Sequence, residues 1–321
     1  MRDPRITLVL LLALVVSLSP GCGRSDRTRI VVIPKATAHV FWQTVHAGAV
    51  AAAKEADVDV EWLGPAAETN FARQIEIVDS AITSRADGIV LAPTEATSLV
   101  GVVERASREG IPLAVFDSGI DTDDYVSFVA TNNYEAGVTA ARELGALLDG
   151  QGTVAMVKMV PGSSSTMQRE KGFEDTLAAE FPGIEKVAEQ YCMSDVAKAL
   201  SAAENMLTAH PDLDSIFASA EPATVGAGRA IKGRNLTGKV KFVGFDFSAP
   251  IEEDLRGGVI NALIVQDPFN IGYQAVKAVL AKMAGETPPK RIDTPTTVVT
   301  RENLSTPEID HLVHPDLSML R

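Results

Sequence analysis

The sequence is poor in cysteine and in basic residues, and each shortage excludes a class of protein. Its 321 residues include only two cysteines, Cys22 and Cys192, so a disulfide framework is not expected. The 29 lysines and arginines are outnumbered by 42 aspartates and glutamates, which gives a formal net charge of −13. Nucleic-acid binding depends on neutralising phosphates with cationic side chains. The chain is therefore not expected to bind nucleic acid.

Motifs of several common chemistries are missing as well. The sequence has no phosphate loop ending in Gly-Lys-Ser/Thr, no His-Glu-x-x-His, no Cys-x-x-Cys and no Gly-x-Ser-x-Gly. Cys192 has neither a matched base nor metal-ligand spacing around it, so it is predicted to be a packed apolar side chain. We therefore expect no enzyme activity, no cofactor and no bound metal.

The N-terminus carries a targeting segment. Arg2 and Arg5 precede an apolar segment of 13 residues, 6–18, which is too short for a comfortable membrane span. The sequence Ser-Pro-Gly-Cys follows, and the whole pattern resembles a bacterial lipoprotein signal, in which the cysteine is lipidated. We expect export to the periplasm or the cell surface, with Cys22 as the lipid anchor.

This interpretation divides the N-terminus into a signal peptide, residues 1–22, and a short tether, residues 23–28. Ordinary secretion with cleavage nearby is the alternative, because Ser19 stands where the lipoprotein pattern prefers leucine.

The remaining chain alternates short apolar runs with helix-length segments, which is typical of β-α-β units around buried parallel sheets. The pattern occurs twice. Two apolar runs end in Phe-Asp, at 113–118 and 242–248, and earlier runs at 87–93 and 214–221 precede them. The sequence therefore predicts two similar Rossmann-like halves, each a three-layer α/β/α domain with a parallel sheet.

Ligands of such sheets bind beyond the carboxyl ends of the strands. Asp117 and Asp246 fall at these ends, one in each half. Two facing halves that each offer a carboxylate describe a cleft that closes on a polar ligand.

The sequence also predicts several local elements. A helix is predicted over 96–109, the Pro-Gly-Ser-Ser-Ser-Thr run 161–166 is predicted to be a loop before a helix that opens with Gln168, and a strand is predicted over 296–300. The last twenty residues are polar and are expected to be peripheral.

Seven segments, in their order along the chain, resemble the periplasmic sugar-binding proteins of the ribose-binding type. These proteins serve ABC importers and share their fold with the ligand-binding half of lac-repressor-like regulators. The resemblance spans about residues 29–305 and rests on segments 39–49, 87–96, 110–118, 168–173, 209–218, 240–246 and 265–276.

The resemblance implies the periplasmic binding protein type I fold, with two domains joined by a hinge of three chain crossings. The N-terminal sugar-binding domain would comprise 29–131 plus 267–292, and the C-terminal one 132–266 plus 293–321. A monomer is expected.

The resemblance also implies ligand-binding residues in the first half. Phe41 and Trp42 match the aromatic pair that packs against the sugar ring, and His39 matches a polar position that reaches the ligand. An aromatic face covers the apolar C–H face of a sugar without competing for its hydroxyls. Asp117 matches a carboxylate that accepts from hydroxyls, and Ser118 replaces the arginine that often follows it, so a charged donor is missing on that side.

In the second half, Arg169 matches a donor to the ring oxygen or hydroxyls, Asp246 the second strand-end carboxylate, and Gln266 a hinge residue that reaches the ligand. One position departs from the family pattern. Ala220 replaces the usual asparagine, so either Glu221 takes over its role or the ligand lacks a hydroxyl at that corner.

The function implied is that of an extracytoplasmic solute-binding lipoprotein, which captures a monosaccharide in an interdomain cleft and delivers it to an ABC import permease. The alternative is a sensor subunit that presents a sugar or signal molecule to a membrane kinase or chemoreceptor. A DNA-binding regulator is disfavoured, because an export signal occupies the place of the helix-turn-helix.

Overall fold

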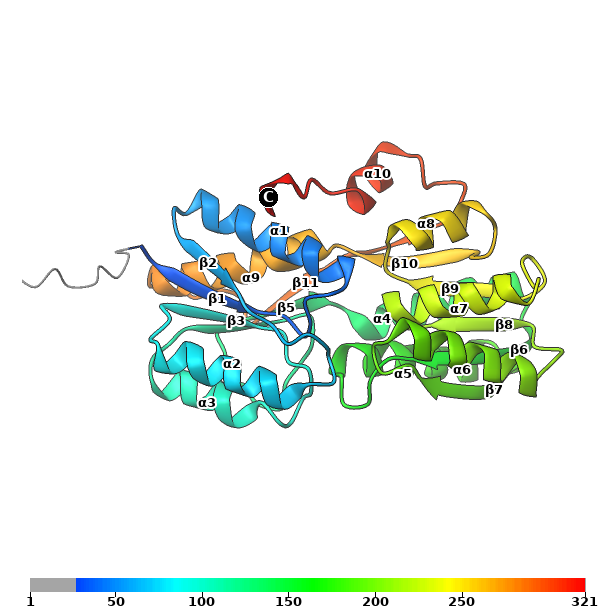
Figure 1. Ribbon diagram of the computed structural model, residues 1–321, viewed down its shortest axis with the longest axis horizontal. Helices are drawn as coiled ribbons and strands as arrows, with labels where there is room; N and C mark the ends of the chain where they lie inside the picture. The colour runs from blue at the N-terminus through cyan, green and yellow to red at the C-terminus, as the bar shows by residue number, and fades with distance from the viewer. Residues whose placement is uncertain (1–26, 321) are drawn as a thin grey trace, which may run out of the picture.

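The computed structural model describes residues 27–320 and contains two α/β domains, each built around one six-stranded sheet (Figure 1). Largely parallel strands flanked by helices confirm the predicted fold class. The predicted signal peptide and Cys22 lie outside the described residues. Between residues 27 and 320, no helix is long and apolar enough to cross a membrane.

The first sheet contains only parallel neighbours. From one edge to the other, its strands are β2 (Asp59–Trp62), β1 (Arg29–Ile33), β3 (Gly88–Leu91), β4 (Leu113–Phe116), β5 (Phe128–Thr131) and β11 (Arg291–Thr294).

The second sheet repeats this order except at its last strand. Its strands are β7 (Gly183–Tyr191), β6 (Gln151–Lys158), β8 (Ser215–Ala218), β9 (Lys241–Phe245), β10 (Ala262–Gln266) and β12 (Thr296–Val299). β12 is antiparallel to β10, which departs from the expected parallel sheet. The physical reason is that β12 follows β11 after one residue, with no crossover helix to bring the chain back to the starting edge.

Helices cover both faces of each sheet. In the first domain, α1 (Val40–Glu55) and α9 (Pro268–Met283) cover one face, and α2 (Phe71–Thr83) and α3 (Val100–Arg108) the other. In the second, α4 (Asn133–Leu147) and α5 (Ser164–Glu180) lie opposite α6 (Val196–Ala209), α7 (Glu221–Gly233) and α8 (Ala249–Arg256).

The central strands are apolar throughout because both of their faces are buried. In β1, Val32 packs toward α1 and α9, whereas Val31 and Ile33 pack toward α2 and α3. In β6, Val154 and Met156 face α4 and α5, and the alternate residues face the other helix layer. A near-continuous apolar strand of this kind is what a parallel sheet covered by helices on both sides requires.

Glycines allow the equivalent helix pairs to pack closely. A Cβ at Gly48 of α1 would lie 1.9 Å from the carbonyl oxygen of Phe269 in α9. A Cβ at Gly137 of α4 would lie 2.0 Å from the carbonyl oxygen of Arg169 in α5. Only glycine permits such close approach of two helix backbones.

The chain passes between the sheets three times: after β5, after β10, and between β11 and β12. The strand predicted over 296–300 is confirmed as β12. The sequence analysis did not predict the strand before it, β11, which belongs to the other sheet, because β11 has only four residues and is mostly polar.

Two helix starts differ from prediction. α3 begins at Val100, not near 96, because the Glu95 carboxylate accepts hydrogen bonds from the N–H groups of Thr97 and Ser98 and holds a turn there. α5 begins at Ser164, so half of the predicted Ser-rich loop forms its first turn. Serine is favoured just before a helix, where Ser163 stands.

The C-terminal residues are not merely peripheral. They form α10 (Pro307–Val313) and a short 3₁₀ turn, η1 (Ser318–Leu320). Leu304 and Ile309 are buried in the core of the second domain. Leu312 and Val313 pack against the same core, a placement that overall composition does not reveal.

Candidate functional site

A cavity lies between the two domains, at the carboxyl ends of both sheets. Its empty space is about 350 Å³ when the open solvent at its mouth is included, and about 30 Å³ of it admits the centre of a water-sized sphere. The structure brings together most of the predicted ligand residues in its wall: His39, Phe41, Trp42, Asp117, Arg169, Glu221, Asp246 and Gln266. The wall also includes residues that the sequence analysis missed, among them Lys35, Glu68, Met159, Ser165 and Thr166.

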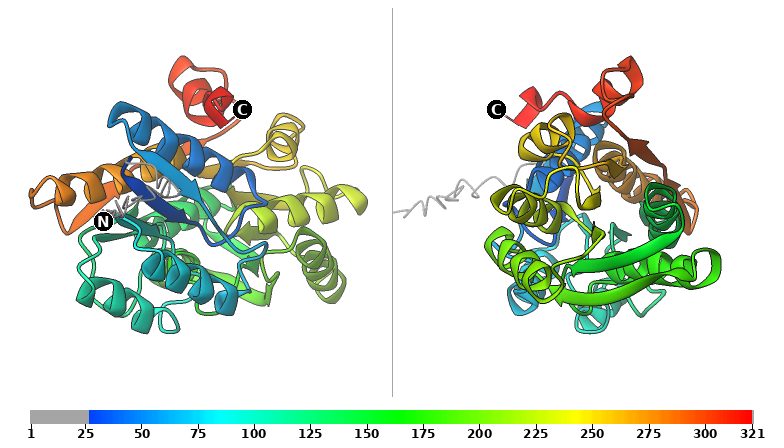
Figure 2. Two further views of the ribbon diagram at one scale, coloured as in Figure 1. Left: turned by 60° about the vertical axis from the view of Figure 1, so that its left-hand side comes forward. Right: turned by 90° about the vertical axis from the view of Figure 1, so that its right-hand side faces the viewer.

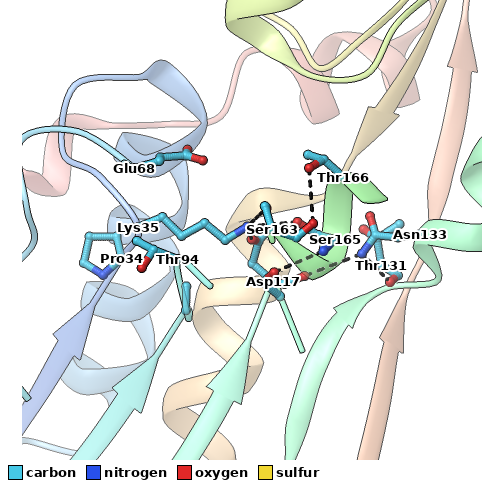
Figure 3. A network of polar contacts seen from close by, with 12 residues as sticks. Pro34, Lys35, Glu68, Thr94, Asp117, Thr131, Asn133, Ser163, Ser165 and Thr166 are labelled. Atoms are coloured by element: carbon cyan, nitrogen blue, oxygen red, sulfur yellow. Dashed lines mark hydrogen bonds and ion pairs between the residues drawn. The ribbon is translucent and has the colours of Figure 1, made fainter. Parts of the chain in front are cut away.

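Lys35 and Asp117 form a buried ion pair in the first-domain wall. The Lys35 Nζ lies 2.7 Å from Asp117 Oδ2, and each side chain is less than 5% exposed. The Lys35 ammonium also donates to Ser163 Oγ at 3.1 Å and Ser165 Oγ at 2.9 Å, so it reaches the second domain (Figure 3).

The inference that a charged donor is missing beside Asp117 is therefore wrong, because Lys35 provides one. The signal that could have found it is its position: Lys35 follows Pro34 just beyond the end of β1, where the reasoning used for Asp117 also applies. The sequence analysis missed it because lysines are seldom buried without a partner.

The aromatic pair stands at the start of α1. The Phe41 and Trp42 rings meet edge to face at 4.9 Å between centroids. Trp42 Nε1 donates to Glu68 Oε1 at 3.1 Å, and its ring packs into the core against Phe116. Trp42 therefore packs in the core of the first domain and also lines the cavity. Phe41 is the more exposed of the two.

His39 and Ser118 contact the opposite domain. His39 Nε2 lies 3.1 Å from Ser194 Oγ. Ser118 does not line the cavity; its hydroxyl accepts from the Ser165 N–H at 3.1 Å. The structure therefore places Ser118 at the contact between the domains, beside the cavity rather than in its wall.

Arg169 is held rigidly in the second-domain wall. Its Nε donates to Asn133 Oδ1 at 2.7 Å, and its Nη1 donates to the Ser219 carbonyl at 3.0 Å. The guanidinium lies 4.4 Å from the centroid of the Phe245 ring, a cation–π contact. A buried arginine fixed from three sides is a preorganised donor.

Asp246 and Gln266 form a hydrogen-bonded corner of the same wall. Asp246 accepts from the Glu221 N–H at 3.0 Å and from Gln266 Nε2 at 2.7 Å. Burial raises the pKa of Asp246, and the positive charge of Arg169 opposes this rise. Gln266 Oε1 is buried and has no hydrogen-bond partner among the described residues. An unsatisfied buried acceptor is costly, so a ligand hydroxyl that donates to it would be favoured.

Glu221 reaches across to the first domain. One of its carboxylate oxygens accepts from the Phe41 N–H at 3.3 Å, at the start of α1. Burial, followed by the nearby charge of Asp246, raises the pKa of Glu221 to about 7, although the N–H groups of Phe41 and Val40 oppose the rise.

The domains are in a closed arrangement. Besides the contacts of Lys35, His39, Ser118 and Glu221, the Ala96 N–H donates to the Gly162 carbonyl at 3.3 Å. These hydrogen bonds join strand-end loops of opposite domains, so the cavity is bounded by both.

The described residues contain no group of three or more His, Cys, Asp or Glu side chains that could hold a metal ion. Cys192 is fully buried, and burial raises the pKa of its thiol to about 11. This environment agrees with the predicted role as a packed apolar side chain.

Comparison with known proteins identifies the family. Residues 30–287 match the periplasmic binding protein domain family. The D-ribose/D-allose-binding protein of Pseudomonas aeruginosa is 29% identical over 287 residues, which cover 86% of this chain and 89% of the relative. The D-allose-binding periplasmic protein of Escherichia coli is 28% identical over 267 residues, which cover 80% of this chain and 86% of the relative.

Two solved structures are also similar. A carbohydrate transporter solute-binding protein from Agrobacterium radiobacter, in complex with D-arabinose, superposes with a TM-score of 0.88 at 34% identity and covers 91% of this chain and 100% of its own. An ABC transporter solute-binding protein from Agrobacterium vitis, with bound D-fucose, gives 0.87 at 34% identity, covering 89% and 100%. These relatives are binding components of transporters, not enzymes. The chain belongs to the periplasmic binding proteins, among those of the sugar-binding, ribose type.

Proposed function

We propose that this protein captures a monosaccharide in the cavity between its domains and delivers it to an ABC import permease. The observation that carries the proposal is the composition of the cavity wall. Aromatic rings come from the first domain, and buried charged and amide groups come from both. A sugar has apolar C–H faces and hydroxyl edges, and this wall complements both.

Each wall has its own role in this proposal. Phe41 and Trp42 cover an apolar face of the sugar ring. Asp117 and Asp246 accept from hydroxyls, Arg169 and Lys35 donate to oxygens, and Gln266 Oε1 gains the donor that it lacks. Charge-assisted hydrogen bonds of this kind are the strong ones in a binding site.

Ala220 and Glu221 together line the corner where the family usually has asparagine. We infer that Glu221 supplies an acceptor there, while its bond to the Phe41 N–H joins the two domains. The ligand hydroxyl at this corner would then be a donor.

Isothermal titration with D-arabinose, D-fucose, D-ribose and D-allose tests the proposal, because these sugars appear among the ligands of the relatives. We expect one-to-one binding of at least one monosaccharide and its recovery unchanged. Matched titrations with a dicarboxylate and with an amino acid serve as controls. Binding of either control without any sugar would contradict the proposal.

We further propose that the mature chain is anchored by a lipid on Cys22, as the signal pattern at residues 1–22 indicates. A Cys22→Ser variant should leave the membrane fraction and still bind sugar. Retention of that variant in membranes would mean that residues 6–18 remain as an uncleaved anchor.

A further inference from the structure

The residues after β12 form a segment, 300–320, that touches both domains and is called here the C-terminal strap. It leaves the second sheet, runs along the outside of the molecule past α8 and ends beside α1 of the first domain (Figures 1 and 2). It lies outside the sugar cavity and contributes no residue to its wall.

The first part of the strap is anchored to the second domain. Ile309 of α10 is buried in that domain's core, and Leu312 and Val313 pack against it. His314 Nε2 lies 3.1 Å from Glu252 of α8, and its ring meets Phe247 edge to face at 5.7 Å. These contacts hold the strap as far as His314.

The last part of the strap contacts the first domain. η1 packs against α1. Between them lies a larger cavity, in which about 380 Å³ admits the centre of a water-sized sphere. Its lining includes Leu317 from the strap, Val40 and Thr44 from α1, and Pro268 from the hinge. Leu317 and Leu320 are half-buried.

The strap is thus a fourth link between the domains, in addition to the three chain crossings. The helix that it touches carries Phe41 and Trp42, so the strap restrains the aromatic wall relative to the second domain. A contact made in only one of two arrangements shifts their equilibrium by its own free energy.

We propose that the C-terminal strap stabilises the closed arrangement and so determines how widely the ligand-free protein opens. Closure carries α1 against the strap, which the second domain holds in place. The apparent affinity of a ligand that binds the closed form falls as the closed fraction falls. Removal of the strap's tip therefore weakens sugar binding without changing any cavity residue.

The test compares the full mature chain with a variant that ends at Pro315, which loses η1 but keeps α10 and His314. We expect small-angle scattering of the ligand-free variant to give a larger radius of gyration than the full chain. Saturating D-arabinose, or whichever monosaccharide binds, should return both to the same compact value. The dissociation constant should rise by about three- to tenfold in the variant.

A point variant guards against misfolding of the truncated chain. Leu320→Ala should change the ligand-free radius and the affinity in the same direction by a smaller amount, whereas Ser318→Ala, at an exposed position of the same turn, should change neither. An unchanged ligand-free radius in the truncated chain, with a melting curve that remains cooperative, would overturn the proposal. The expected change in dissociation constant rests on the proposed sugar binding, whereas the expected change in ligand-free radius does not. An absence of sugar binding would therefore leave the proposal for the strap open to test by the radius alone.

Discussion

Asp117 and Asp246 occupy equivalent places in the two domains, yet their charges are balanced differently. Each directly follows a buried strand and has a positive φ, 58° and 65°. Asp117 is paired with the Lys35 ammonium, whereas Asp246 accepts from two neutral donors, Gln266 Nε2 and the Glu221 N–H.

This difference shows that a repeated architecture repeats the position of a side chain but not its electrostatic environment. In the second wall, Glu221 lies near Asp246. The cation that opposes the raised pKa of Asp246 is Arg169, and its hydrogen bonds go to the Asn133 side chain and the Ser219 carbonyl. Asp117 therefore has a cation in direct contact, whereas Asp246 lies near the carboxylate of Glu221 and accepts from neutral donors. The following predictions test that contrast.

The largest effect is expected when the ion pair of Asp117 with Lys35 is broken. Asp117→Asn leaves the buried Lys35 ammonium without its counter-charge, a change that costs about 3–5 kcal/mol in buried pairs. Asp246→Asn removes a carboxylate that accepts from neutral donors and lies near the Glu221 carboxylate, so its cost should be smaller. Asparagine also tolerates the positive φ at both positions. Urea unfolding of the ligand-free variants measures the two losses.

The double variant Lys35→Met with Asp117→Asn supplies the control for this experiment. It removes both charges and should recover part of the stability lost by Asp117→Asn alone, because no unpaired ion is left buried. Equal losses for the two single variants would show that the surroundings of Asp117 and Asp246 do not differ in their effect on stability.

An intermediate effect is expected at the close helix contacts. Gly48→Ala and Gly137→Ala each place a methyl group about 2 Å from a carbonyl oxygen, and overpacking of this kind costs about 1–3 kcal/mol. The methyl group added at position 137 would clash with the backbone of Arg169, which lines the cavity. The one added at position 48 would clash with the backbone of Phe269, which does not line it. Gly137→Ala should therefore reduce both stability and sugar affinity, and Gly48→Ala mainly stability. Calorimetry and thermal unfolding separate the two readouts, and a larger loss of affinity in Gly48→Ala would reverse this assignment.

The smallest effect is a pH dependence that arises from the second wall alone. Burial, followed by the charge of Asp246, raises the pKa of Glu221 in the closed form to about 7, above its usual value near 4.5. Opening would expose Glu221 to water and remove part of this rise. The closed form therefore holds a proton that the open form releases between these values, and closure takes that proton up. Sugar affinity should be highest at low pH and should fall by at most about tenfold per pH unit as pH rises to 7, then level off.

Asp246, whose pKa is also raised, contributes in the same direction. Glu221→Gln should flatten most of the profile measured by titration calorimetry between pH 5 and 8. A profile of the same steepness in that variant would assign the proton to another group.

Part of the site could be predicted from residues at strand ends and helix starts. Asp117, Asp246 and the aromatic pair at 41–42 lie in the cavity wall because local pattern places them beyond the sheet edge. Lys35 obeys the same rule, but lysine has a strong general tendency to be exposed, so its burial depends on Asp117, which lies far along the chain. Glu68 was missed for a similar reason, since its partner is the Trp42 indole.

By itself, the sequence determined the fold class, the duplication and the polar strand ends, because each of these follows from a short-range period or from the residue that ends an apolar run. Only the tertiary structure decided which groups meet across the cleft and where the final strap lies. The contacts of Lys35 with Ser163 and of Glu221 with Phe41 join residues more than a hundred positions apart. Their geometry depends on how two separately packed domains face each other, and no local pattern contains that information.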